Sequence, residues 1–135
     1  MKITQVIKKL NNTELGKART NDTYVLIPKN LDISDLFPAV NKQIGFINKE
    51  NGEIINLRYT MGREKRVVGL GPYYNKYSVC AGDEIVLERQ IVKGESQYFI
   101  NLKKRLNVVI LKRQKSGFEV LTKDRINLLD SVSSN

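Results

Sequence analysis

The chain has 135 residues, of which 41% are hydrophobic and 27% are charged, so it is long and apolar enough for one packed domain and global disorder is not expected. Its net charge is +9 and it contains no histidine. An excess of this size favours a polyanionic partner, which could be nucleic acid, an acidic membrane surface or an acidic protein, over an inert basic surface.

Most of the chain has the alternating, β-branched composition of short strands. Within 52–60, the apolar side chains of Ile55, Leu57 and Tyr59 share one face of the expected strand. An Asn-Gly pair at 51–52 predicts a hairpin turn before it. The expected strands are 4–10, 23–29, 42–50, 52–60, 65–71, 83–93, 96–104, 106–114 and 118–121.

Two stretches are predicted to be short helices. The first is 31–40, where Asp32 and Ser34 are capping candidates and Pro38 limits the end. The second is 72–79, which begins with proline. Many short strands with frequent turns predict a mainly β barrel or sandwich, closed at its ends by the two helices. We expect one domain over 1–121 and a C-terminal tail or linker over 122–135.

Few residues have a pattern typical of catalysis. The chain lacks the commonest general base, and Glu64 and Glu88 have no second acid at a spacing suited to magnesium. Cys80, the only cysteine, excludes an internal disulfide, fits a reducing cytoplasm and is expected in the core. No apolar run approaches ~20 residues, so no membrane partner is expected. We therefore predict a cytoplasmic protein that is not itself an enzyme, with no catalytic residue, metal or cofactor.

Two polar, glycine-containing segments interrupt the strands, at 11–22 and at 58–71. Both mix cations with side chains that can bond to base edges. Arginine can donate to guanine, asparagine can bond to adenine, and a carboxylate can accept from cytosine. Asn21, Asp22 and Glu64 therefore suggest base recognition. Each has an ordinary alternative, because Asn and Asp are common turn residues and Glu64 could simply pair with Arg63 or Arg66.

Three runs carry a resemblance to a known family: "KKLNNTELGKARTNDTYVLIPKNLDISDLFPAVN", "LRYTMGREKRVVGLG" and "YSVCAGDEIVLER". They resemble the DNA-binding pseudobarrel of the EcoRII restriction endonuclease effector domain and of its relatives, which include plant B-three transcription-factor domains. The resemblance covers roughly residues 5–90. Its most specific pieces are 27–41, the "REKR" turn at 63–66 and the Gly-Asp pair at 82–83.

The resemblance implies a seven-stranded open β-barrel with two short helices and two loops that grip the major groove. The N-arm would fall at 11–24 and the C-arm at 58–66, with Gly62 permitting the bend. The "EKR" of the family's C-arm matches Glu64, Lys65 and Arg66. The C-arm candidates are Arg58, Thr60, Arg63, Glu64, Lys65 and Arg66, and the N-arm candidates are Lys17, Arg19, Thr20, Asn21 and Asp22.

The expected function is sequence-specific binding of double-stranded DNA at a short site, as the target-recognition module of a bacterial restriction-modification system. A catalytic nuclease domain or subunit would be its partner. Two alternatives remain open. One is a self-contained metal-dependent endonuclease, and the other is a basic β-barrel that binds RNA or single strands. The second needs exposed aromatic platforms, whereas the cluster Tyr73, Tyr74 and Tyr77 is expected in the core.

Overall fold

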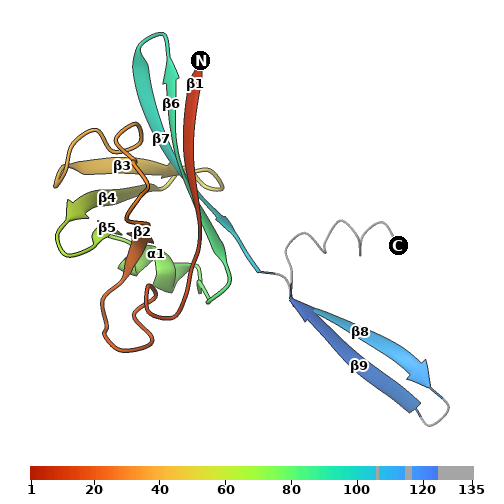
Figure 1. The fold of residues 1–135 in the computed structure, drawn as a ribbon. Coiled ribbons are helices and arrows are strands. Elements are labelled where there is room, and N and C mark those ends of the chain that lie inside the picture. Colours follow the sequence, from red (N-terminus) through yellow and green to blue (C-terminus); the bar gives the residue numbers. More distant parts are fainter. Residues whose placement is uncertain (106, 115–116, 125–135) are drawn as a thin grey trace.

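The computed structural model describes residues 1–105, 107–114 and 117–124, and side chains over 1–105 (Figure 1). Each expected strand is present in the described residues, with bounds that differ by a few positions. The elements are β1 (Lys2–Lys9), β2 (Tyr24–Ile27), β3 (Gln43–Asn48), β4 (Ile54–Met61), β5 (Lys65–Val68), α1 (Gly71–Lys76), β6 (Glu84–Val92), β7 (Glu95–Lys103), β8 (Asn107–Gln114) and β9 (Gly117–Asp124).

Seven strands form one curved sheet in the order β1-β6-β7-β3-β4-β5-β2. All neighbours in it are antiparallel except β3 and β7, which are parallel. The sheet curls into an open barrel whose edges are β1 and β2, so the predicted seven-stranded open barrel is confirmed. Among the residues that the structure describes, strands β8 and β9 pair only with each other. The division at residue 121 stays a prediction, and the expected tail lies outside the described residues from 125 onward.

The barrel interior is built by side-chain alternation along the strands. On β4, Ile55, Leu57 and Tyr59 share one face as predicted and are buried there, whereas Asn56 and Arg58 between them are exposed. Phe37 from the loop after β2 packs on Phe46 of β3, with ring centroids 5.4 Å apart. Burying each such side chain stabilises the fold by about 1.5–3 kcal/mol. The packed barrel is therefore a stable support for the loops that connect its strands.

One of the two predicted helices forms. Tyr73 and Tyr74 of α1 are buried, and burial raises the pKa of both phenols. The Tyr74 hydroxyl donates to the Tyr24 carbonyl at 2.8 Å, which ties α1 to β2. Tyr73 and Tyr74 therefore pack in the core as expected, while Tyr77 is half-buried against it.

The predicted helix at 31–40 is wrong, because only a single turn forms there. The N–H groups of Leu36 and Phe37 both donate to the Ile33 carbonyl, at 2.9 and 2.8 Å. Pro38 follows directly, disfavours a helical conformation at the residue before it and has no N–H to continue the ladder. The turn instead delivers Leu36 and Phe37 into the core, where both are fully buried.

The expectation that Cys80 lies in the core is also wrong. Its side chain is exposed, and its Sγ donates to the Ser78 carbonyl at 3.3 Å. The turn after α1 contains Ser78 at φ +48° and Gly82 at φ +95°, and it directs Val79 inward instead. Among the helices of the described residues, none has the length and apolarity to cross a membrane.

Two buried carboxylates lie along β6, Asp83 directly before its first residue and Glu88 at its middle. Asp83 accepts from the backbone N–H groups of Cys80 (2.8 Å) and Arg105 (2.7 Å) and from Lys104 (3.0 Å). Burial alone would raise the pKa of Asp83, but these hydrogen bonds outweigh it and lower the pKa. Glu88 has a lowered pKa for the same balance of reasons, with bonds from Gln5, Gln90 and Lys49. Both acids therefore act as bonded structural groups.

Candidate nucleic-acid interface

The two predicted arms are attached to neighbouring strands. The C-arm is the β4–β5 hairpin, and the N-arm is the loop that leads into β2, which pairs with β5 (Figure 1). Arg66 on β5 lies opposite Thr60, and Val68 lies opposite both Arg58 and Tyr24. Residues that are directly opposite in antiparallel strands share a face. The outer face of β4, β5 and β2 thus joins side chains from both arms.

The tip of the C-arm is the short turn at 62–64. The Gly62 N–H donates to the Glu64 carbonyl at 3.1 Å, and Arg63 at the apex is exposed. A Cβ on Gly62 would meet nothing within 4 Å, and Gly62 has no left-handed φ. The bend therefore does not require glycine, contrary to the expectation from sequence.

Arg66 lies at the junction of the two arms. Its Nη2 is 2.6 Å from Glu64 Oε1 on the C-arm, and its Nη1 is 3.9 Å from Asp22 Oδ2 on the N-arm. The guanidinium lies over the ring of Tyr24, 3.9 Å from its centroid. The hydrogen bond to Glu64 is the main cause of a raised pKa at Arg66. Of the two pairings that the sequence offered for Glu64, the structure contains the one with Arg66.

The remaining C-arm candidates divide into engaged and unengaged side chains. Lys65 donates to the Leu31 carbonyl at 3.1 Å, and the Thr60 hydroxyl donates to the Arg66 carbonyl at 3.3 Å. Arg58 and Arg63 are exposed, and neither side chain has an ion pair or hydrogen bond within residues 1–105. These two arginines are the C-arm cations best placed to meet an anion without first breaking a bond.

The N-arm is a loop of tight turns that presents its tip to solvent. Arg19, Thr20, Asn21 and Asp22 are all exposed, and the Asp22 N–H donates to the Thr20 hydroxyl at 3.3 Å. Gly16 closes the loop at φ +73°, where a Cβ would lie 2.8 Å from the Asn21 carbonyl oxygen. Only glycine fits that approach, so Gly16 sets the conformation of the tip.

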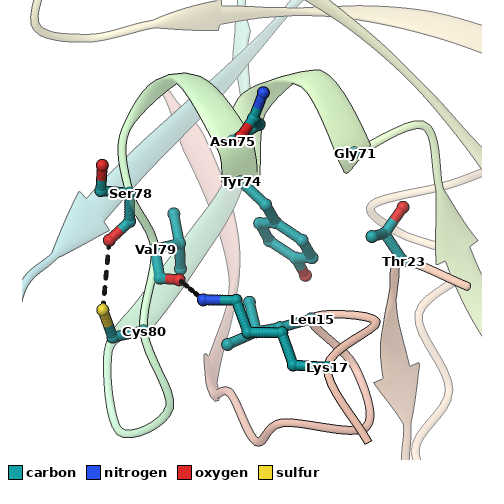
Figure 2. Close-up of a pocket in the computed structure, with 9 residues that line it drawn as sticks. All are labelled: Leu15, Lys17, Thr23, Gly71, Tyr74, Asn75, Ser78, Val79 and Cys80. Atoms are coloured by element: carbon teal, nitrogen blue, oxygen red, sulfur yellow. Dashed lines mark hydrogen bonds between the residues drawn. The ribbon is translucent and has the colours of Figure 1, made fainter. Parts of the chain in front are cut away.

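Lys17 does not join the other N-arm candidates. Its Nζ donates to the Val79 carbonyl at 3.4 Å, which turns the side chain toward the segment after α1 (Figure 2). It lines a cavity of about 340 Å³ between the N-arm base and α1, which Cys80 also borders. The structure thus groups Arg19 to Asp22 at the tip and leaves Lys17 at the base.

Glu14 anchors the N-arm and was missed from the sequence. Its buried carboxylate accepts from the N–H groups of Leu26 (2.7 Å) and Asn11 (3.2 Å), and it lies 3.7 Å from Lys8 Nζ. The Glu14 N–H in turn donates to the Asn11 side chain at 2.9 Å. The Asn-x-x-Glu spacing of this reciprocal pair resembles a capping box, which is the signal that could have identified it.

The C-arm surrounds a hollow of about 310 Å³ on the surface. Its lining offers guanidinium donors, one hydroxyl and one carboxylate, which are groups that can hydrogen-bond to base edges in the major groove. The lining residues are Thr60, Met61, Gly62, Arg63, Glu64 and Arg66.

Among the described residues, no group of three or more His, Cys, Asp or Glu side chains is arranged to hold a metal ion.

Comparison with known proteins finds a similarity of fold but none of sequence. No protein-family model matches the chain, and no curated protein is significantly similar in sequence. A solved structure with a similar fold is the Arabidopsis FUS3–DNA complex, with a TM-score of 0.51 and 16% identity, covering 73% of this chain and 95% of the other. At this identity the likeness is one of fold, and it agrees with a B-three-like pseudobarrel.

Proposed function

We propose that this chain binds double-stranded DNA in a sequence-specific manner, with the N-arm and the C-arm in the major groove. The observation that carries the proposal is the junction of the two arms on one outer face. The loop before β2 and the β4–β5 hairpin bring Arg19, Arg58 and Arg63 to the surface without partners among the described residues. The pseudobarrel fold, shared with a protein solved in complex with DNA, supports the same conclusion.

Sequence specificity is supported by the acids on the arms. A surface that binds only phosphate gains nothing from carboxylates, since they repel the DNA backbone. Asp22 and Glu64 nevertheless lie at the exposed face beside the cations. There they can orient arginines and accept from cytosine N4, which are uses that a base-reading interface has for them.

The proposal also includes the biological system in which the chain would bind DNA. We place the chain as the target-recognition module of a bacterial restriction-modification system, working with a nuclease domain or subunit in the cytoplasm. This assignment rests on the resemblance of the "REKR" turn and the 27–41 segment to the EcoRII-type effector domain. Adding candidate nuclease subunits to the chain and a plasmid that carries the selected site would test it, and cleavage only when both proteins are present is the expected result.

The test of binding is a selection from random duplex DNA, followed by competition with single-stranded DNA and RNA of the selected sequence. Enrichment of one short motif, with duplex competing far better than either single strand, is the expected result. Equal recovery of all sequences would overturn the specificity, and better competition by single strands or RNA would overturn the duplex partner. Incubation of the chain alone with plasmid and magnesium tests the nuclease alternative, and we expect no cleavage.

A further inference from the structure

We infer that Arg66 is a positioning residue that couples the N-arm to the C-arm, so that the two arms meet DNA as one preorganised unit. This inference rests on the proposed function, but it concerns a different property. It assigns Arg66 to the protein's own arms, and it leaves direct contact with DNA to the unengaged arginines of the same face.

The geometry around Arg66 is that of a side chain held on three sides. Glu64 of the C-arm occupies Nε and Nη2, at 3.1 and 2.6 Å from the same carboxylate oxygen. Asp22 of the N-arm approaches Nη1 from the other end at 3.9 Å. The Tyr24 ring supports the planar face, and this ring is itself buried although it lies on the outer side of the sheet. Planar stacking combined with two acidic partners fits arginine and not lysine.

The charge balance also argues against a simple phosphate contact. Arg66 contributes one positive charge to a cluster that contains two carboxylates, so the cluster has a net charge of −1 if all three groups are ionised. Removing the arginine would leave both acids uncompensated on the DNA-facing surface. Arg66→Ala would then weaken binding because the two carboxylates repel the DNA phosphates and because the arms are no longer held together, in addition to any lost contact of Arg66 with DNA.

Coupling through a shared partner predicts effects that do not add. Asp22 belongs to one arm and Glu64 to the other, and both act on the same guanidinium. Because Arg66 is itself on the C-arm, its contact with Asp22 is the bridge between the arms, and Glu64 orients the guanidinium for that contact. Without Asp22, Glu64 has no bridge left to orient, and without Glu64 the guanidinium is released, so that removal of Asp22 has less left to disrupt. Residues in one ion-pair network show this kind of interaction energy in double-mutant cycles.

The first experiment needs no DNA. Amide hydrogen exchange is measured across 16–23 in the unmodified chain and in Glu64→Gln, whose change lies on the other arm. We expect exchange in the N-arm to be at least several-fold faster in the variant, while the β6–β7 hairpin is unchanged. Glu95→Gln, at an exposed position on β7, is the matched control. Unchanged N-arm exchange in Glu64→Gln would overturn the coupling, whatever the chain binds.

The second experiment measures affinity for the selected duplex and for an unrelated duplex at several salt concentrations. Arg66→Lys keeps the charge, so the salt slope should not change. Because lysine lacks the planar guanidinium that holds the arms, we expect its affinity for the selected site to fall at least tenfold. The double variant Asp22→Asn/Glu64→Gln should lose little more than the worse single variant. A phosphate-contacting Arg66 gives the opposite pattern, in which Arg66→Lys is tolerated and Arg66→Ala lowers the slope by about one unit. If the unmodified chain discriminates between no sequences at all, the proposed function fails while the exchange result still stands.

Discussion

The buried carboxylate of Glu14 accepts a 2.7 Å hydrogen bond from the backbone N–H of Leu26, across the base of the N-arm. We expect Glu14→Ala to lower the free energy of unfolding by about 2–3 kcal/mol, because the Leu26 and Asn11 N–H groups lose the buried carboxylate that accepts from them. Urea denaturation measures the change. Glu95→Ala, at an exposed position, is the control and should stay within about 0.5 kcal/mol of the unmodified chain. If Glu14→Ala changed the free energy of unfolding as little as the control does, Glu14 would not be an anchor of the N-arm.

Gly16 and Gly62 form a matched pair, one on each arm. Gly16→Ala places a Cβ against the Asn21 carbonyl at positive φ, and we expect a loss of about 1–3 kcal/mol in unfolding free energy together with a changed N-arm conformation. Gly62→Ala meets open space and should change stability by less than about 0.5 kcal/mol. Backbone NMR shifts of 11–23 provide the second readout. The prediction fails if the two substitutions have the same effect.

Acid should destabilise the fold through Asp83 and Glu88. The folded state lowers both pKa values below their ordinary values of 3.8 and 4.5, so the unfolded state binds protons first as the pH falls. Their stabilisation is complete above about pH 4.5 and is lost as the pH drops through the lowered folded values. Unfolding free energies measured from pH 7 to pH 3 should fall less steeply in Glu88→Gln than in the unmodified chain. Parallel curves would show that Glu88 is not held as a bonded carboxylate.

Cys80 should behave as an accessible thiol. Because the side chain is exposed in the folded chain, a thiol reagent is expected to modify one thiol per chain under native conditions, without prior unfolding. The same assay in Cys80→Ser should give no signal, and that variant should keep the stability of the unmodified chain to within about 0.5 kcal/mol. Modification that occurs only in denaturant would place Cys80 in the interior.

The strands could be predicted because their pattern is local. Ile55, Leu57 and Tyr59 alternate with polar residues, and that period alone fixes which face is buried. The helix predicted at 31–40 does not form, because a single turn ending at Pro38 already brings Leu36 and Phe37 into the barrel core. Cys80 was wrongly expected in the core because Val79 and Cys80 are adjacent small apolar residues, and the sequence does not show which of the two side chains points inward.

Contacts between residues far apart in the chain could not be predicted from the sequence. Glu88 and Gln5 are 83 positions apart, so nothing in the local sequence shows that this carboxylate is bonded and buried. Tyr24 was assigned to a strand, but its role beneath Arg66 depends on the pairing of β2 with β5. By contrast, the pairing of Glu64 with an arginine was among the alternatives, because both residues belong to one turn.

The most direct test of DNA recognition by the arms is the affinity of Arg63→Ala for the selected duplex and for an unrelated duplex of equal length. Fluorescence anisotropy at fixed salt gives both values, and Lys93→Ala, an exposed cation in the β6–β7 turn, is the control. A bidentate base contact contributes about 1–3 kcal/mol of discrimination, so we expect Arg63→Ala to weaken binding to the selected site by roughly 5- to 150-fold and to the unrelated duplex far less. Lys93→Ala should bind both as the unmodified chain does. Equal losses on both duplexes, or no loss with Arg63→Ala, would contradict the account.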